Sequence, residues 1–269
     1  MSMNKDYVHW NKKAWNNKVP YHLSSKFYNN DAFIQGKSSL KAPELALLGN
    51  VQDKSILHLQ CHFGQDSVSL SRLGAIKVLG VDFSDKAINE AKKLAELCEQ
   101  STRFTDSDVY SFNPAGEQKF DIVFTSYGTI GWLPDLTLWA QTISRSLNNN
   151  GTFVMVDFHP FVWTFDDDMR MPTYDYFNTE AIIETTNGTY ADRSAPLEDT
   201  TYSWNHSLAD ILQALIDAGL QLEQFKEYPY SSYNCFSNLK EIARDQFVFA
   251  HLEVQVPMMY GIRAKLNEK

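Results

Sequence analysis

The stretch Ile56–Ser67 reads ILHLQCHFGQDS, a short apolar run followed by a turn and the first residues of a helix. In an α/β fold that binds a nucleotide, the loop after the first strand is usually rich in glycine. Here the loop contains a single glycine, Gly64. Three interpretations are therefore open: a degraded cofactor loop, a working variant of such a loop, or an ordinary turn between strand and helix.

On both sides of this stretch, apolar runs alternate with helical patterns. The second run, Ile76–Asp82, is almost entirely apolar, as expected for a strand covered on both faces. Helices are predicted after Ser84, which provides a side-chain cap, and over residues 136–147. The predicted strands are Ser55–Leu59, Ile76–Asp82, Thr102–Asp106, Phe120–Ser126 and Thr152–Phe158. This alternation predicts an α/β fold, a doubly wound parallel sheet with helices on both faces.

The C-terminal part follows a different order. A helix is predicted from Ser207, which forms a capping pair with Asp210, to Gly219. Leu220–Tyr228 and Val254–Leu266 then read as two strands without a clear helix between them. We expect these strands to be antiparallel neighbours at the edge of the sheet.

Two segments lie outside the alternating pattern and divide the chain into four parts. We expect residues 1–50 to form an aromatic, helical N-terminal lid and residues 51–158 to form the cofactor-binding core. Residues 159–206 are too long for an ordinary connection and are predicted to be an inserted cap. Residues 207–269 complete the sheet of the same domain.

Composition excludes several classes of partner. The formal net charge is −9, and no block of Lys and Arg interrupts it, so we expect no nucleic-acid partner. The three cysteines are widely spaced, which indicates neither a disulfide framework nor a zinc site. No apolar segment predicts a signal peptide or a membrane span, so a cytoplasmic protein without a membrane partner is expected. The sequence does not indicate an oligomeric state.

Asp82 ends the second predicted strand, where a carboxylate can accept hydrogen bonds from the two hydroxyls of a ribose. The structural alternative is that Asp82 only caps the helix after Ser84. A dinucleotide loop would require glycine at three positions, which are Gln60, His62 and Gln65 in this chain. A pyrophosphate-binding loop is therefore a poor fit.

The order of motifs resembles that of the class I S-adenosylmethionine-dependent methyltransferases. Their first motif, commonly LDLGCGTG, corresponds to residues 57–64, LHLQCHFG, in which only the last glycine is kept. Better matches follow in VLGVDFS (78–84), TDSDVYSF (105–112), FDIVFTSYGTIGWLPD (120–135) and NNNGTFVMVDF (148–158). The final VPMMYGIRAKL resembles the family's antiparallel last strand, which implies a seven-stranded sheet. The phrase LHLQCHFGQDS itself is typical of a bacterial subgroup.

This resemblance implies S-adenosyl-L-methionine as the cofactor and assigns roles to particular residues. Asp82 would hold the ribose, Phe83 would pack against the adenine, and Asp108 would accept the exocyclic amine while the Val109 backbone faces the ring. Gln60 and His62 would replace backbone contacts to the cofactor's carboxylate with side-chain hydrogen bonds. The full set of expected cofactor-binding residues is Gln60, Cys61, His62, Gly64, Asp82, Phe83, Ser107, Asp108, Val109 and Thr125.

Candidates for a catalytic role follow the fourth and fifth predicted strands. They are Tyr127 and His159, and for each the alternative is packing or anchoring of a loop. His22 is a further candidate if the N-terminal segment folds over the site. His58 and Cys61 are expected to be core residues rather than a base and a nucleophile. The run Asp166–Asp168 reads as a solvated turn, and no metal site is predicted.

The sequence thus predicts an S-adenosylmethionine-dependent methyltransferase that acts on a small-molecule acceptor by direct in-line displacement. Aromatic residues in both irregular segments favour an apolar or aromatic acceptor. Two alternatives remain open: a non-catalytic module that binds S-adenosylmethionine or S-adenosylhomocysteine, and a nicotinamide-dependent oxidoreductase, which the missing glycines disfavour.

Overall fold

The computed structural model describes residues 6–114 and 119–267, so the first residues of the predicted lid lie outside the described part. The helices are α1 (Asp6–Ser24), α2 (Asn30–Ile34), α3 (Ala42–Leu48), α4 (Gln65–Arg72), α5 (Asp85–Leu97), α6 (Leu136–Ser146) and α7 (Leu208–Asp217). The strands are β1 (Ser55–Leu59), β2 (Lys77–Asp82), β3 (Arg103–Asp106), β4 (Phe120–Ser126), β5 (Leu147–Phe158), β6 (Ile182–Asn187), β7 (Glu198–Ser203), β8 (Leu220–Tyr228), β9 (Leu239–Ala243), β10 (Gln246–Phe249) and β11 (Met259–Leu266).

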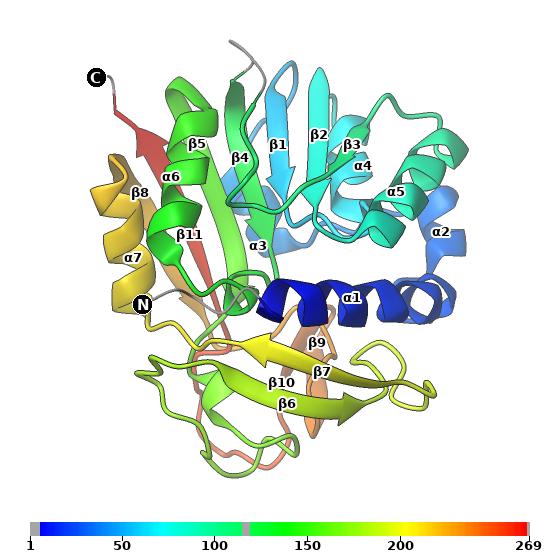
Figure 1. Cartoon of the computed structure of the whole chain (residues 1–269), viewed down its shortest axis with the longest axis vertical. Helices are drawn as coiled ribbons and strands as arrows, with labels where there is room; N and C mark the ends of the chain where they lie inside the picture. The colour runs from blue at the N-terminus through cyan, green and yellow to red at the C-terminus, as the bar shows by residue number, and fades with distance from the viewer. Residues whose placement is uncertain (1–5, 115–118, 268–269) are drawn as a thin grey trace. The chain divides into compact units, whose positions relative to one another are not determined.

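Seven of these strands form the main sheet, in the order β3-β2-β1-β4-β5-β11-β8 (Figure 1). β1, β2 and β3 pair in parallel, as do β4 and β5. β11 runs antiparallel to β5 on one side and to β8 on the other. The predicted seven-stranded, mostly parallel sheet with an antiparallel last strand is therefore confirmed, and β8 is its edge strand.

Two strand boundaries differ from the prediction. β5 begins at Leu147 rather than Thr152, because Leu147 pairs with Phe120 across a bulge in the ladder with β4. β11 begins at Met259 rather than Val254, whose side chain is exposed. Between β8 and β11 the chain forms the small antiparallel hairpin β9–β10, which the sequence does not predict.

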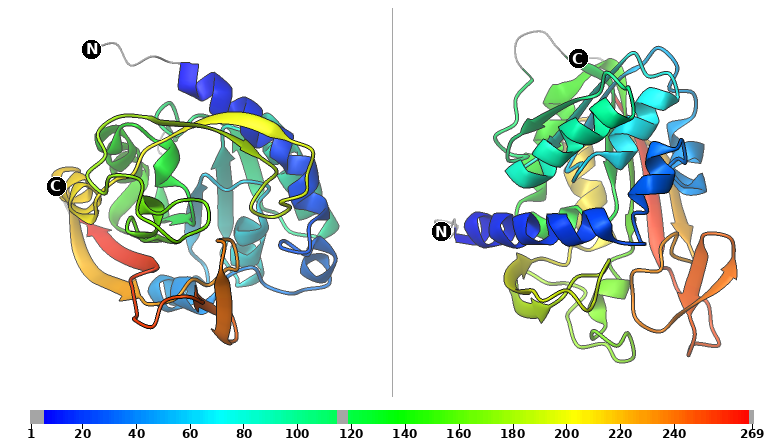
Figure 2. Two further views of the ribbon diagram at one scale, coloured as in Figure 1. Left: turned by 90° about the horizontal axis from the view of Figure 1, so that it is seen from below. Right: turned by 90° about the vertical axis from the view of Figure 1, so that its right-hand side faces the viewer.

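The chain divides into two compact units, and the first consists of residues 1–39, 51–112 and 181–203. In this unit α4 packs on β2, and α5 packs on β2 and β3. The hairpin β6–β7 lies along α1 (Figures 1 and 2). Asn11 fixes that contact, because its side chain both donates to the carbonyl of Tyr202 and accepts from its N–H, each at 2.8 Å.

The second unit consists of residues 40–50, 113–180 and 204–269. Its strands β4, β5, β11 and β8 carry α6 and α7 on one face and α3 on the other (Figures 1 and 2). Trp139, Phe153 and Tyr260 are fully buried in this unit. The predicted insertion 159–206 is thus shared between the units, and the predicted boundaries at 50, 158 and 206 stay predictions. None of the helices in the described ranges is long and apolar enough to span a membrane.

Candidate functional site

The loop between β1 and α4 has the backbone conformation of an alternating glycine loop, although two of its three glycine positions carry side chains. Gln60, His62 and Gly64 have positive φ angles of 55°, 50° and 85°. This left-handed conformation costs about 1 kcal/mol for a residue with a Cβ, and glycine adopts it freely. The chain therefore keeps the shape of the loop while it places Gln60 and His62 where the motif LDLGCGTG has glycine.

Gly64 is required at its position for a second reason, which is close packing. A Cβ on Gly64 would lie 2.5 Å from the ring of Phe104, and a Cβ on Gly80 of β2 would lie equally close to that ring. Cys61 is buried at the same place, and its burial raises the pKa of the thiol well above the ordinary value. A neutral, buried thiol agrees with the expected filling role of Cys61.

Asp82 lies at the end of β2 and accepts backbone hydrogen bonds on both of its carboxylate oxygens. The N–H of His62 donates to Oδ2, and the N–H of Ser84 donates to Oδ1, both at 2.9 Å. Burial raises the pKa of Asp82 to about 6 against the effect of these bonds. Because a carboxylate has about four acceptor positions, acceptor capacity remains for hydroxyl groups of a ligand. Ser84, in turn, caps α5 through the N–H of Ala87, so the capping role considered for Asp82 is carried by its neighbour.

The residues after β3 belong to the same unit as Asp82. The N–H of Ser107 donates to the carbonyl of Asp82 at 2.9 Å. The side chain of Asp108 accepts from the N–H groups of Tyr110 and Ser111, at 2.9 and 3.2 Å. Val109 is buried, and Phe83, after β2, is half-buried. The first unit thus brings together nine of the ten expected cofactor-binding residues; Thr125 belongs to the second unit.

The side chain of His62 contacts the N-terminal helix. Its Nε2 lies 2.8 Å from Nδ1 of His22 on α1. The rings of Trp15, Tyr28 and Phe63 surround His62, with centroids 4.5 to 5.7 Å from it. The sequence indicates His22 only as a further catalytic candidate, since nothing in it pairs two residues from such distant segments. His58, by contrast, is a satisfied core residue, 2.8 Å from Ser67 Oγ.

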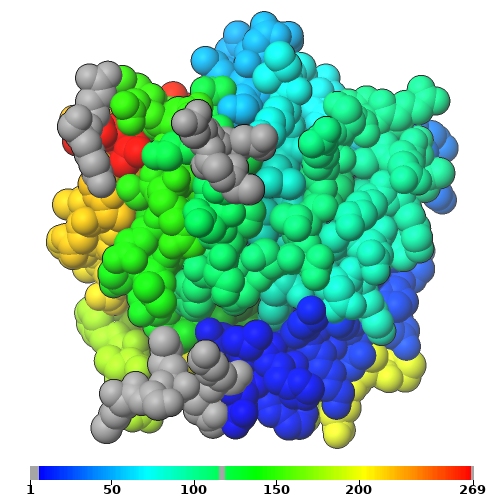
Figure 3. Space-filling model, turned by 45° about the horizontal axis from the view of Figure 1, so that its top comes forward, coloured from blue at the N-terminus to red at the C-terminus, as the bar shows by residue number. Residues whose placement is uncertain are grey.

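α1 is attached to the rest of the first unit beside Asp82. Asn16 accepts from the hydroxyl of Ser84 at 2.6 Å and donates to Asp85 at 3.1 Å. Lys12 forms an ion pair with Asp85 at 3.0 Å. Figure 3 shows the α1 side chains (dark blue) against the teal region that contains α5. The N-terminal helix is therefore a structural part of the unit that holds Asp82 and His62.

In the second unit, Thr125 is fully buried on β4, and Tyr127 follows that strand with a φ of 42°. The Tyr127 ring packs edge-on against Tyr233. Burial, and then the nearby carboxylate of Glu44, raise the pKa of the Tyr127 phenol well above its ordinary value. The Tyr127 phenol is therefore protonated at neutral pH, which argues against its acting as a base.

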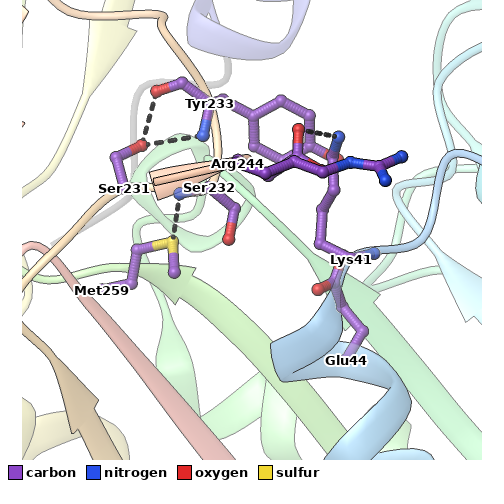
Figure 4. A network of polar contacts seen from close by, with 8 residues as sticks. Lys41, Glu44, Ser231, Ser232, Tyr233, Arg244 and Met259 are labelled. Carbon is purple, nitrogen blue, oxygen red and sulfur yellow. Dashed lines mark hydrogen bonds and ion pairs between the residues drawn. The ribbon is translucent and has the colours of Figure 1, made fainter. Parts of the chain in front are cut away.

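Figure 4 shows the surroundings of Glu44, a buried residue at the start of α3. Ser231 Oγ donates to the carbonyl of Tyr233 at 2.7 Å, and the N–H of Ser232 contacts the sulfur of Met259 at 3.2 Å. Lys41 pairs with Asp245 at 3.0 Å. These contacts attach the segment after β8 to β11 and the turn between β9 and β10 to the residue before α3.

His159, after β5, uses both ring nitrogens within the protein. Its Nδ1 accepts from the N–H of Phe161 at 3.0 Å, and its Nε2 lies 2.9 Å from a carboxylate oxygen of Glu227. In the neutral tautomer that fits these partners, Nε2–H donates to Glu227. The geometry favours loop anchoring, and a catalytic role for His159 stays a prediction. Asp166 accepts from the N–H of Arg170, and the described residues contain no cluster of three metal-binding side chains.

Residues 56–151 match the family model described as "Methyltransferase domain". An uncharacterized protein of Haemophilus influenzae is 26% identical over 191 residues, which cover 70% of this chain and 75% of that protein.

Solved structures with the same fold include methyltransferases from several bacteria. An S-adenosylmethionine dependent methyltransferase from Mesorhizobium loti superposes with a TM-score of 0.59 and 20% identity, covering 86% of this chain and 99% of that one. An S-adenosylmethionine-dependent methyltransferase from Clostridium acetobutylicum superposes with a TM-score of 0.57 and 14% identity, covering 97% of this chain and 100% of that one. Geranyl diphosphate C-methyltransferase from Streptomyces coelicolor was solved in complex with S-adenosyl-L-homocysteine. It superposes with a TM-score of 0.51 and 13% identity, covering 82% of this chain and 73% of that one. Residues 56–151 of this chain therefore match a methyltransferase domain, and the sheet with its antiparallel strand β11 has the fold of S-adenosylmethionine-dependent methyltransferases.

Proposed function

We propose that the first unit binds S-adenosylmethionine and that the protein transfers its methyl group to a small-molecule acceptor. The observation that carries this proposal is the hydrogen bond between the His62 N–H and Asp82, which joins the loop after β1 to the carboxylate at the end of β2. The fit to the cofactor is supported by the remaining acceptor capacity of a buried carboxylate and by a loop that keeps its left-handed backbone at Gln60 and His62.

Each part of the cofactor has a residue of matching chemistry in this unit. Asp82 would accept from the ribose hydroxyls, and Phe83 would pack against the adenine ring. Asp108 would accept from the exocyclic amine, with Val109 next to the ring. Gln60 and His62 would donate to the carboxylate at the amino-acid end. These roles require an ionised Asp82, which its pKa of about 6 supports at neutral pH.

The chemistry that S-adenosylmethionine supplies is a methyl group on a sulfonium, which leaves as a neutral thioether. The protein's task is then mainly alignment of the acceptor, because little covalent help is required. A general base is needed only for an acceptor that loses a proton during transfer. Tyr127 and His159 remain the candidates in the second unit, although the raised pKa of Tyr127 and the two occupied nitrogens of His159 argue for binding or anchoring roles.

For the acceptor we propose a small molecule with an apolar or aromatic body. In the first unit, Trp15, Tyr28 and Tyr190 gather around His22 and His62, and the hydroxyls of Tyr28 and Tyr190 share a hydrogen bond. Aromatic faces of this kind bind flat or apolar groups. The net charge of −9 disfavours a nucleic acid as the acceptor.

Calorimetry with three ligands tests the proposal and its alternatives. We expect saturable binding of S-adenosylmethionine and S-adenosylhomocysteine and no binding of NAD. Absence of binding for both sulfur ligands would refute the proposed cofactor, while NAD binding would favour the oxidoreductase. Incubation of the protein with labelled S-adenosylmethionine and a panel of aromatic alcohols and amines, followed by mass spectrometry, would then separate an enzyme from a binding module.

A further inference from the structure

The pair His22–His62 joins the cofactor loop to a helix outside the matched methyltransferase domain. Nδ1 of His22 and Nε2 of His62 are 2.8 Å apart, and His22 is fully buried on α1. Nε2 of His22 has no hydrogen-bond partner among the described residues. A buried ring nitrogen without a partner is uncommon and calls for an explanation.

The two rings share one proton, and its position determines what the pair can bind. Burial is the main cause that lowers the pKa of His22 to about 3 and that of His62 well below its ordinary value. Both rings are therefore neutral at neutral pH, and one donates to the other. If His62 donated, Nε2 of His22 would carry an N–H buried without a partner, and such orphaned donors are rarer than orphaned acceptors. The arrangement that avoids this has His22 Nδ1–H as the donor and His62 Nε2 as the acceptor.

In this arrangement the only ring proton of His62 is on Nδ1, which makes that atom a hydrogen-bond donor. The His62 side chain makes no other hydrogen bond in the described part of the chain. Lys18 lies close to the pair: its Nζ is 5.2 Å from the centre of the Trp15 ring, and burial lowers its pKa against the effect of the Asp199 carboxylate. An N–H donor without a partner in the protein suits an anionic acceptor.

We propose that His22 is a positioning residue for cofactor recognition, which holds His62 in the tautomer that donates Nδ1–H to the carboxylate at the amino-acid end of S-adenosylmethionine. This inference rests on the proposed function and adds a residue of the N-terminal helix to the cofactor site. It also explains how a loop without its usual glycines recognises that carboxylate. The loop supplies a side-chain donor, and α1 fixes the donor's protonation.

The test compares two ligands that share the nucleoside and differ in the amino-acid end. S-adenosylhomocysteine has the carboxylate, and 5′-methylthioadenosine lacks it. Calorimetry is performed on the wild type, on His22→Phe, which removes the donor, and on His22→Asn, whose amide can replace Nδ1–H. His9→Asn, an exposed position on the same helix, is the control.

We expect His22→Phe to bind S-adenosylhomocysteine about 10 to 100 times more weakly, the effect of losing one hydrogen bond to a charged group. Its affinity for 5′-methylthioadenosine should not change, and His22→Asn should recover most of the loss. An equal loss for both ligands would show a merely structural role, and no loss for either would overturn the proposal. If the wild type binds neither ligand, the proposed function itself fails.

A second measurement does not depend on any ligand. Nitrogen-15 NMR of the imidazole rings in the ligand-free protein reports which ring nitrogen carries the proton. We expect His62 in the Nδ1–H form in the wild type and a mixture of forms in His22→Phe. A wild-type His62 protonated on Nε2 would overturn the inference even if the variants fold poorly.

Discussion

The backbone N–H of His62 donates to Oδ2 of Asp82 at 2.9 Å, so the loop after β1 and the end of β2 meet at one carboxylate. The other oxygen of Asp82 accepts from the N–H of Ser84, which begins α5. One buried side chain therefore fixes the loop, the strand end and the helix start. The same side chain is the expected partner of the ribose.

Replacing Asp82 should abolish cofactor binding. Asp82→Ala removes the acceptor for the ribose and releases the His62 N–H, so we expect no measurable affinity for S-adenosylhomocysteine by calorimetry. Asp106→Ala is the matched control, because Asp106 is the exposed register partner of Asp82 on β3. Full binding by Asp82→Ala, or equal losses in both variants, would contradict the assigned role.

Cofactor affinity should depend on pH through the ionisation of Asp82. Burial raises the pKa of this carboxyl to about 6. The charged form, which accepts hydrogen bonds best, is therefore lost as the pH falls through about 6. We expect the affinity for S-adenosylhomocysteine to decrease from pH 7 to pH 5. Asp82→Asn should bind weakly at every pH, and a wild-type affinity that is flat over this range would contradict the prediction.

His22 should make the folded protein sensitive to acid. Its pKa is lowered from 6.5 in the unfolded chain to about 3 in the folded one. Between these values the unfolded state binds the proton and the folded state does not, so stability is lost as the pH falls from 6.5 toward 3. Relative to His22→Phe, the wild type should lose up to about 1.4 kcal/mol of unfolding free energy per pH unit in this window. Urea denaturation at several pH values measures the difference, and parallel curves for the two proteins would refute it.

Gly64→Ala should destabilise the protein more than an alanine at another left-handed glycine. The new Cβ at position 64 meets the Phe104 ring at 2.5 Å, whereas Gly219, with a similar φ of 88°, has nothing within 4 Å of its Cβ position. We expect a cost of about 1 kcal/mol for Gly219→Ala, from the backbone alone. Crowding against Phe104 should add about 1–3 kcal/mol in Gly64→Ala. If urea denaturation gave equal losses of unfolding free energy for Gly64→Ala and Gly219→Ala, the Phe104 ring would move aside without an energetic cost, and the prediction would be wrong.

His159→Ala should lower stability and leave cofactor binding intact. The substitution removes the hydrogen bonds to the Phe161 N–H and to Glu227, for an expected cost of about 1–3 kcal/mol. Calorimetry with S-adenosylhomocysteine should give the wild-type affinity, because no expected cofactor contact involves His159. Once an acceptor is known, a large fall in turnover with unchanged cofactor affinity would support the catalytic role that the anchoring geometry disfavours.

The core of the fold follows from local sequence patterns. β1, β4 and β8 have the predicted boundaries, because apolar residues and flanking turn residues specify a buried strand locally. The capping pair Ser207 and Asp210 likewise begins α7 where expected, with Ser207 Oγ accepting from the Asp210 N–H at 3.1 Å. The hairpins β6–β7 and β9–β10 were not predicted, because β6 and β9 contain no buried residue and their sequences show no clear apolar alternation.

The sequence also indicates that Asp82 and Asp108 follow neighbouring strands, and the structure has Asp82 at the end of β2 and Asp108 just after β3, while their roles toward a nucleoside stay predictions. The partner of His62 could not be predicted. His22 is 40 residues away in a helix with little amphipathic pattern, and only tertiary packing brings the two rings together. The contacts of α1 with β7 are still harder to predict from the sequence, because Asn11 and Tyr202 are 191 residues apart. The sequence therefore indicated which loop carries the unusual residues, and the structure supplies what they contact.

The most direct test of this account is a crystal structure of the protein with S-adenosylhomocysteine. We predict both ribose hydroxyls on the carboxylate of Asp82, the adenine amine on Asp108, and the amino-acid carboxylate within hydrogen-bond distance of His62. A ligand whose ribose does not contact Asp82, or that binds outside the first unit, would contradict it.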